Sequence, residues 1–280
     1  MTSNQHLRVC LVVNDENAPD LEAEHGLAIW IETPGARILF DTGKGHAVFV
    51  NAERLNLQLA QTDFIVLSHG HYDHAGGLAH AIRIAPQAKL YLHPDAVLPR
   101  YVVSQDGSAR EIGMPKAAKA VLAALDERRI IWLTGQTYLA EKIGVCTEIP
   151  RKTAFEDTGG SFYLDPEGAR PDPIADDLAL WIETPQGLVI LVGCSHAGII
   201  NIINHIRHIT GIEKIRAIIG GLHLITASDE RLSATVAALR QVSPGAILPC
   251  HCTGQKAVEV LKQSLGERVV RCYAGLTYTA

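Results

Sequence analysis

Residues 64–78 read FIVLSHGHYDHAGGL, and this stretch decides how the rest of the chain is interpreted. It begins with an apolar run, Phe64–Leu67, that is typical of a short buried strand. The strand leads into the loop Ser68–His74, and Gly76-Gly77 then opens the segment Leu78–Ala85, which has the apolar spacing of a short helix. The pattern predicts a strand, a histidine-rich loop and a helix in succession.

The loop carries four potential metal ligands, which are His69, His71, Asp73 and His74. Neutral imidazole nitrogen and carboxylate oxygen are ligands that zinc, iron and manganese accept. In a turning loop, His69 and His71 can hold one ion while Asp73 and His74 hold a second. An exposed histidine-rich loop without a metal is the alternative, but four donors within six residues favour a metal site. We therefore expect a metal-dependent enzyme.

Composition limits the other classes of protein. With 280 residues, 47% of them hydrophobic and 20% charged, the chain is expected to form an ordinary globular domain. The 25 basic and 30 acidic residues argue against nucleic acid as the main partner, because phosphate binding needs a surplus of positive charge. No apolar run approaches the ~20 residues that span a bilayer, and Met1–Leu7 is polar, so we expect a cytoplasmic protein without membrane contact.

Short apolar or β-branched runs alternate with helical patterns along much of the chain, which predicts a layered α/β architecture. Further strands are expected at Leu7–Val13, Leu27–Glu32, Arg37–Phe40, Lys89–Leu92, Leu178–Glu183, Leu188–Val192, Arg216–Ile219, Ala246–Leu248 and Val269–Cys272. Further helices are expected at Pro115–Arg129, Gly198–Ile209, Ser228–Gln241 and Gln255–Leu265. Residues 153–176 are rich in Gly, Pro and Asp and are expected to form a long loop that covers a substrate pocket.

An internal repeat indicates two similar halves. Residues 27–34 read LAIWIETP and residues 178–185 read LALWIETP, and each copy continues into another apolar strand. The first of these strands ends at Asp41-Thr42-Gly43 and the second at Gly193–His196. We infer a single domain with halves at about residues 1–93 and 178–280, joined by a connecting or lid region at 94–177. If so, the two strand ends should lie near each other.

These motifs resemble the metallo-β-lactamase superfamily, whose signature HxHxDH appears here as HGHYDHAGGL at residues 69–78, with the strand-end Asp41 upstream. The resemblance implies an αββα sandwich with one or two metal ions at the sheet edge. More closely, the chain is similar to the dihydropterin ribofuranosyl-aminobenzene 5′-phosphate synthase-like hydrolases over nearly its whole length. The further motifs that carry this similarity are Glu24-His25-Gly26, Ile38–Gly43, Gly193–Ile199, Gly220–Leu224 and His251–Gly254.

The resemblance also implies ligands outside the loop. His251 matches the final histidine of the superfamily, and His196 is the best candidate for the third histidine. Cys194 stands where a bridging aspartate is usual, so its thiolate is either a metal ligand or a small buried side chain at a strand end. His223 is either a group that donates a proton to the leaving group or a hydrogen-bonded structural histidine.

The roles of Arg151 and of the pair Cys250 and Cys252 are predicted from less specific patterns. Cys250 and Cys252 flank His251 and alternate with it, so we expect both to face away from a metal that His251 binds. Arg151 is either an exposed loop residue or a group that binds an anionic part of the substrate.

The expected function is hydrolysis by a water that the metal activates, with Asp73 orienting that water. Zinc, as one or two ions, is the expected cofactor, with iron or manganese as alternatives. The expected partner is a small and anionic substrate, such as a phosphoester, a lactone or a pterin-ribofuranosyl compound; homo-oligomerisation stays open. Two other functions remain: an iron-dependent redox enzyme of the same fold, and a metal-binding or sensing protein without turnover.

Overall fold

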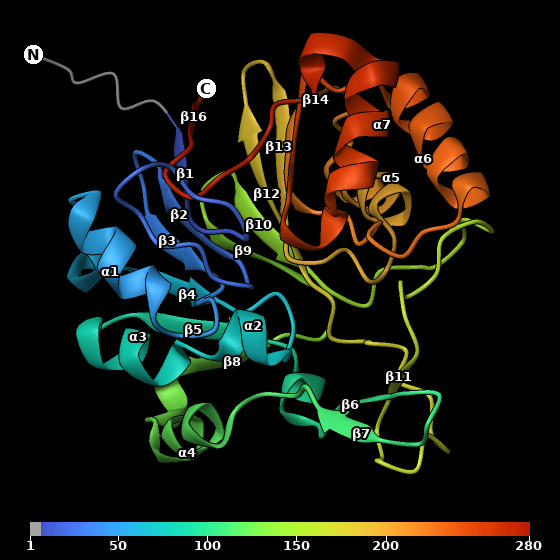
Figure 1. Ribbon diagram of the computed structural model, residues 1–280. Coiled ribbons are helices and arrows are strands. Elements are labelled where there is room, and N and C mark those ends of the chain that lie inside the picture. The colour runs from blue at the N-terminus through green and yellow to red at the C-terminus, as the bar shows by residue number, and fades with distance from the viewer. Residues whose placement is uncertain (1–6) are drawn as a thin grey trace, which may run out of the picture.

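The computed structural model describes residues 7–280, and two β-sheets packed face to face form its centre (Figure 1). Residues 1–6, which contributed to the expectation of a cytoplasmic protein, lie outside the described residues. The first sheet has the order β16 (Thr277–Thr279), β1 (Arg8–Val13), β2 (Ala28–Glu32), β3 (Arg37–Phe40), β4 (Phe64–Val66), β5 (Lys89–Leu92) and β8 (Ile130–Trp132). The second has the order β15 (Ala246–Cys250), β14 (Ile215–Gly221), β13 (Gly187–Val192), β12 (Ala179–Thr184), β10 (Ile143–Cys146) and β9 (Gln136–Ala140).

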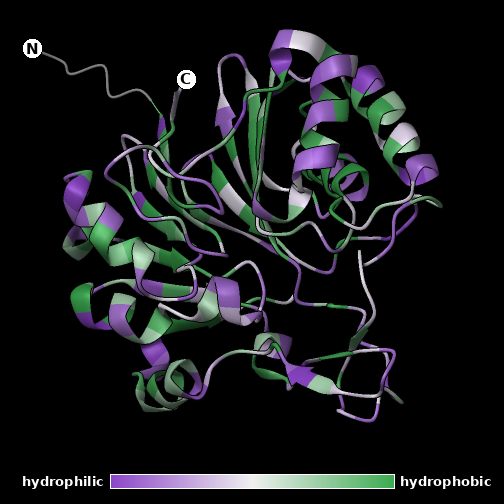
Figure 2. Ribbon diagram, viewed as in Figure 1, coloured by the Kyte–Doolittle hydropathy of each residue, from purple (hydrophilic) through white to green (hydrophobic). Residues whose placement is uncertain are grey.

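Helices cover the outer face of each sheet. The first sheet carries α1 (Ala47–Arg54), α3 (Leu78–Ile84) and α4 (Lys116–Ala124), while the second carries α5 (Ile199–Thr210), α6 (Asp229–Val242) and α7 (Gln255–Leu265). A short helix, α2 (Tyr72–Ala75), lies in the histidine-rich loop. Single 3₁₀ turns occupy Leu59–Gln61, Pro94–Val97, Glu127–Arg129, His251–Thr253 and Gly266–Arg268. Figure 2 shows hydrophobic residues concentrated in the sheets and on the inner helix faces.

The strand directions are the same in the two sheets. In the first sheet β1, β2 and β3 pair antiparallel, and β3, β4 and β5 then pair parallel. In the second sheet β10, β12 and β13 pair antiparallel, and β13, β14 and β15 then pair parallel. The repeated tryptophans, Trp30 and Trp181, are both fully buried beneath the outer helices. The αββα sandwich of two similar halves is thereby confirmed.

The segment between the halves differs from its expected description. Residues 94–177 were expected to connect the halves or form a lid, but β8, β9 and β10 lie within them and belong to the two main sheets. Only the small sheet of β11 (Phe162–Tyr163), β6 (Tyr101–Val103) and β7 (Ala109–Glu111) stands apart, at the lower right of Figure 1. These strands were missed because they are short, with three residues in β8, five in β9 and four in β10.

Two other predicted elements also differ from the structure. The helix expected at Pro115–Arg129 ends at Ala124, because Leu125 is extended and Asp126 caps a separate 3₁₀ turn. The segment Val269–Cys272 is not a strand, since only one bridge, between Ile247 and Val269, joins it to the second sheet. The chain instead returns to the first sheet, where β16 pairs with β1.

Among residues 7–280, no helix is long and apolar enough to cross a membrane.

A buried ion network ties the middle of the chain to the histidine-rich loop. Arg100 is fully buried, and its guanidinium donates to Asp172 Oδ2 at 2.7 Å and to Asp176 Oδ2 at 2.8 Å. Asp176 Oδ2 also accepts a hydrogen bond of 2.8 Å from the Gly70 main-chain N–H. The charge pair therefore fixes the loop between His69 and His71, and its removal would leave two buried carboxylates without a cation.

We predict that Arg100→Met lowers the free energy of unfolding by about 3–5 kcal/mol, because the Asp172 and Asp176 carboxylates lose their buried partner. Urea unfolding followed by circular dichroism measures the change. Arg128→Met is the matched control, since Arg128 pairs with Asp126 at the surface and should change stability little. A loss for Arg100→Met no larger than that of the control would contradict this account.

Candidate metal centre

The candidate site lies where the carboxyl ends of parallel strands from both sheets meet. Asp41 follows β3, the loop Ser68–His74 follows β4, Cys194 and His196 follow β13, and His251 follows β15. Because parallel strands end at the same edge of a sheet, and the two sheets face each other, these segments converge. The expectation that the two repeated strand ends lie near each other is met, since a Cβ built on Gly193 would lie 3.2 Å from Asp41 Oδ2.

Asp41 orients the side chains of the loop. Its Oδ1 accepts a hydrogen bond of 2.7 Å from the Ser68 main-chain N–H, and its Oδ2 accepts one of 2.6 Å from the Ser68 hydroxyl. Oδ2 also lies 2.7 Å from His74 Nδ1. Because a carboxylate accepts, His74 carries its proton on Nδ1 and directs the lone pair of Nε2 into the site. This Nε2 lies 3.1 Å from Cys194 Sγ.

Two other histidines are held in the same tautomer by their Nδ1 atoms. His196 Nδ1 lies 2.7 Å from the Thr158 carbonyl oxygen, and His251 Nδ1 lies 2.7 Å from Asp15 Oδ1. Each Nδ1 therefore faces an oxygen acceptor, which directs the Nε2 of each ring towards the interior of the site. The Nε2 of His196 is buried and lacks a hydrogen-bond partner among the described residues.

Two groups of donor atoms share the Cys194 sulfur. In the first group, Cys194 Sγ and one ring nitrogen each of His69 and His196 lie within 4.8 Å of one another. In the second, the partners of Cys194 are His74 and His251, within the same limit. Cys194 thus occupies the position between two ligand groups, which is where the bridging aspartate was expected from the resemblance. The ligand role of Cys194 and of the histidines stays a prediction.

The chemistry of these donors fits a pair of divalent cations. His69 Nε2 and His71 Nδ1 lie 2.9 Å apart, so two ring nitrogens point at one position. Burial lowers the pKa of His69 and His196 well below the usual range and that of His71 to about 3, which keeps the three rings neutral as metal ligation requires. Burial also raises the pKa of the Cys194 thiol, so a bound cation is needed to form its thiolate.

Asp73 lies on the open side of the site. Its Oδ2 is 3.3 Å from His251 Nε2 and 3.3 Å from His25 Nε2. Burial raises the pKa of Asp73, but the hydrogen bond with His251 and the nearby His74 lower it more, so the carboxylate is ionised. The His25 side chain is 57% exposed, so this edge is open to solvent. His25 and Asp15 were not predicted as site residues, although Glu24-His25-Gly26 was already recognised as a motif.

Cys252 lies beside Cys194 and His223, and its sulfur is not grouped with the ring nitrogens of His251. Its Sγ, the Cys194 Sγ and a ring nitrogen of His223 all lie within 4.8 Å of one another. The strand alternation that placed Cys252 away from the site stops at Cys250, because His251–Thr253 form a 3₁₀ turn and His251 has φ 45°. Cys250 itself faces the core between the two sheets, as expected.

Arg151 is exposed, which agrees with one of its two predicted roles. Its guanidinium donates to the carbonyl oxygens of His196, Pro173 and Ile174 at 2.7, 2.6 and 3.1 Å, so it also holds the main chain of His196. Its role in binding an anionic group stays a prediction.

Phe162, from the small sheet, covers part of the site. The centroid of its ring lies 5.4 Å from that of His71, 5.3 Å from that of His196 and 5.9 Å from that of His223. The small sheet thus provides an apolar cover over the first ligand group, while the Asp73 edge remains accessible.

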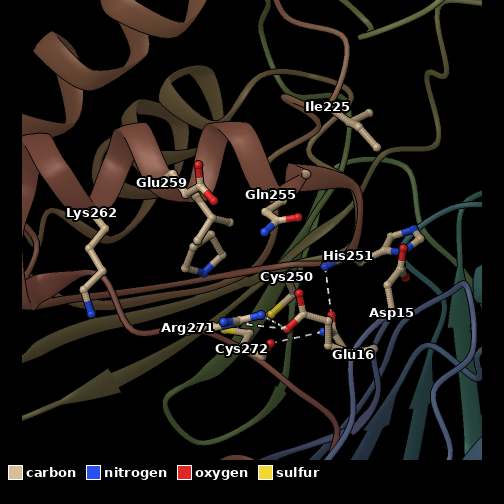
Figure 3. A pocket seen from close by; sticks show the side chains of 14 residues that line it. Asp15, Glu16, Ile225, Cys250, His251, Gln255, Glu259, Lys262, Arg271 and Cys272 are labelled. Carbon is tan, nitrogen blue, oxygen red and sulfur yellow. Dashed lines mark hydrogen bonds and ion pairs between the residues drawn. The ribbon is translucent and has the colours of Figure 1, made fainter.

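A cavity of about 550 Å³ adjoins the second ligand group. Figure 3 shows Asp15 and His251 at one end of it and Lys262 at the other. Arg271 lies between them and is paired with Glu16 at 2.8 Å. The cavity is large enough for part of a small molecule that reaches the site from this side.

The fold and the arrangement of donor atoms indicate one class of protein. Comparisons of the chain with known proteins support the same class. The family model described as the metallo-beta-lactamase superfamily matches residues 21–192. The chain therefore belongs to the metallo-β-lactamase superfamily. Within it, the chain is 32% identical over 265 residues to a protein of Methanocaldococcus jannaschii named 7,8-dihydropterin-6-methyl-4-(beta-D-ribofuranosyl)-aminobenzene-5'-phosphate synthase. That match covers 90% of this chain and 89% of the relative, which confirms the subfamily resemblance.

Solved structures agree with this assignment. The crystal structure of Tm1679, described as a metal-dependent hydrolase of the β-lactamase superfamily, matches with a TM-score of 0.84 at 27% identity. It covers 98% of this chain and 99% of its own. The metallo-β-lactamase fold protein YhfI from Bacillus subtilis matches with a TM-score of 0.60 at 12% identity, over 99% of this chain and 100% of its own, and shows the fold alone.

We predict that Asp41→Asn lowers the affinity for zinc by about 10- to 100-fold, because the amide offers one acceptor oxygen in place of two and removes the negative charge beside His74 Nδ1. Competition with a chromophoric chelator measures the affinity. Asp126→Asn, at a surface ion pair far along the chain, is the matched control. Equal zinc affinity in Asp41→Asn and in this control would show that Asp41 does not support the ligand.

A second prediction concerns Asp177, which supports the segment that carries His196. Its Oδ2 accepts a hydrogen bond of 2.7 Å from the Ala197 main-chain N–H, and burial raises its pKa to about 7. The unfolded carboxyl ionises near its ordinary pKa of about 4. As pH rises from there through the folded pKa, the unfolded state loses its proton first, so wild-type stability falls.

Asp177→Asn removes this titration and keeps the acceptor oxygen. In chelator-treated protein, the variant should gain about 3 kcal/mol in unfolding free energy relative to wild type between about pH 5 and about pH 8. Denaturant unfolding at each pH measures the difference. A difference that stays constant with pH would contradict the raised pKa.

Proposed function

We propose that the protein is a metal-dependent hydrolase that acts on a small anionic substrate, with phosphoesters as the first class to test and lactones as the second. The observation that carries the proposal is the shared position of Cys194 between two groups of donors, beside an edge that is open at Asp73 and His25. A structural zinc site needs four closed ligands and has no open edge. The larger, open donor set supports catalysis over metal storage or sensing.

Zinc is the cofactor that the nitrogen, oxygen and sulfur donors favour, with iron and manganese as alternatives. His69, His71 and His196 would hold one ion, and Asp73, His74 and His251 the other, with Cys194 between them. Bound divalent cations supply Lewis-acid chemistry, since they lower the pKa of water and stabilise negative charge on the reacting group.

The protein's own groups would position the reactants. Asp73 is ionised and lies at the open edge, so its carboxylate can accept a hydrogen bond from water and orient it. His25 contacts Asp73 and is exposed, so it is placed to exchange a proton with the leaving group. Phe162 excludes water from the buried side. His223 was expected to donate the proton; this stays a proposal, but its contact with Cys252 favours another role.

The cavity beside His251 would receive the part of the substrate that does not react. Its lining carries the cations Lys262 and Arg271 and the carboxylates Asp15, Glu16 and Glu259, and Arg271 is paired with Glu16. Lys262 would therefore be the group that attracts an anionic part of the substrate. The name of the Methanocaldococcus jannaschii relative contains a 5'-phosphate and a ribofuranosyl group, and the description of Tm1679 names a hydrolase. The name of the relative supports a phosphorylated substrate, and the description of Tm1679 supports hydrolytic chemistry.

We predict that Asp73→Asn lowers kcat for hydrolysis of bis(4-nitrophenyl) phosphate by about 10²- to 10⁴-fold, because the water loses its orienting carboxylate. Chelation should abolish turnover of the wild type, and added zinc or manganese should restore it. Initial rates and metal content measure both effects, and a homoserine lactone tests the second substrate class.

Asp63→Asn is the control, since Asp63 accepts a main-chain hydrogen bond from Arg37 at the surface. Unchanged turnover and metal content in Asp73→Asn would contradict the assignment. A metal-loaded wild type that hydrolyses neither class would reject the substrate proposal. Visible absorbance of protein purified without chelator would instead favour the iron-dependent redox function.

A further inference from the structure

A second group of soft donors lies behind Cys194. The sulfur of Cys252 and a ring nitrogen of His223 lie within 4.8 Å of each other and of the Cys194 sulfur. Cys252 belongs to the turn after β15, and His223 follows β14, so neighbouring parallel strands deliver both. Neither residue belongs to the two ligand groups described above.

The two sulfur donors are buried, and His223 is partly buried. The two cysteines are free thiols, with 3% and 7% of their surface exposed. The closest acceptor of the Cys252 thiol is the Cys194 carbonyl oxygen at 3.8 Å, which is a long contact. His223 Nδ1 is buried and lacks a hydrogen-bond partner among residues 7–280. Buried polar atoms are rarely left unpaired, so this nitrogen indicates a missing partner.

The backbone holds these donors in an unfavourable conformation. Ser195, His223 and His251 all adopt the left-handed region, with φ of 57°, 46° and 45°. Non-glycine residues there cost on the order of 1–3 kcal/mol each, and such strain gathers at functional sites. Gly221 has no space for a side chain, because a Cβ built on it would lie 2.5 Å from Cys252 Sγ. The main chain at Gly221 therefore leaves the space that the Cys252 sulfur occupies.

We propose that Cys194, Cys252 and His223 form a third metal position, which takes a soft or borderline divalent cation such as Zn²⁺ and shares Cys194 with the centre already described. Two thiolates and one imidazole are a common donor set for zinc. On binding, both thiols release their protons to solvent, and the two thiolates offset part of the positive charge that the cation brings into the buried site.

A second pair of buried cysteines illustrates ordinary side-chain packing in this fold, without a proposed metal site. Cys250 and Cys272 are buried side by side, but their thiols lie 3.2 and 3.5 Å from the carbonyl oxygens of Leu248 and Val270. Both thiols are thus hydrogen-bonded to the main chain, and neither is grouped with an imidazole in the way Cys252 is. Cys250 is therefore the matched control for Cys252.

The test is a titration of the reduced, full-length protein with Co²⁺, which replaces zinc and gives a near-ultraviolet thiolate-to-cobalt band. If Cys194 binds all three cobalt ions and Cys252 binds the third, Cys252→Ser should lose about one quarter of that band at saturation, because one cobalt–sulfur bond of four is removed. Cys250→Ser should keep the wild-type band. His223→Ala should keep the sulfur ligands but weaken binding of the last cobalt equivalent.

A folded Cys252→Ser with the wild-type band and cobalt affinity would overturn the proposal. If this variant does not fold, ¹¹³Cd NMR of the wild type decides, since a resonance in the range of two thiolate ligands supports the site and its absence rejects it. The outcome is independent of hydrolysis. A wild type that shows the Cys252-dependent band but no turnover would support this inference while rejecting the proposed function.

Discussion

The contact between Asp41 and the start of the histidine-rich loop is the constraint on which the site depends. One carboxylate, fully buried at the end of β3, accepts the main-chain N–H and the hydroxyl of Ser68 and holds the Nδ1 of His74. Gly193 of the second half packs directly against Ser68, where a Cβ would lie 2.0 Å from its Oγ. The absence of a side chain at residue 193 lets the two halves approach closely enough to share Cys194.

This approach explains why a duplicated fold forms a single site. Each half ends a buried strand at the same edge, and each supplies donors that are incomplete alone. The first half supplies His69, His71, Asp73 and His74, and the second supplies Cys194, His196 and His251. Hydrogen bonds to carboxylates and carbonyls then set the ring tautomers. The side chains of the predicted ligands are therefore oriented by contacts that lie outside the four-residue signature.

Much of this arrangement could be predicted from the sequence, because the decisive signals were local. The strand–loop–helix signature, the repeated LAIWIETP segment and the helix Gln255–Leu265 with its clear apolar spacing each depend on residues close together in the chain. What could not be predicted depends on turns and on distant pairing. Cys252 turns inward because a 3₁₀ turn ends the strand alternation at Cys250, and β16 forms only because β1 offers it an edge.

The contacts of Arg151 show the same limit. Its exposure was one of the two predicted alternatives, but only the folded chain brings three carbonyl oxygens to its guanidinium. His25 was marked by a motif, but its contact with Asp73 depends on the packing of a loop that has no regular structure. Residues whose role comes from tertiary contacts alone leave no periodic pattern to detect.

The central claim is that Cys194 is the ligand shared by two metal ions. An anomalous difference map from zinc-loaded crystals, collected at the zinc edge, tests it most directly. The account predicts one peak at His69, His71 and His196 and another at Asp73, His74 and His251, each about 2.3 Å from Cys194 Sγ. Two peaks that both lie beyond bonding distance of this sulfur, or no peak at either group, would contradict it.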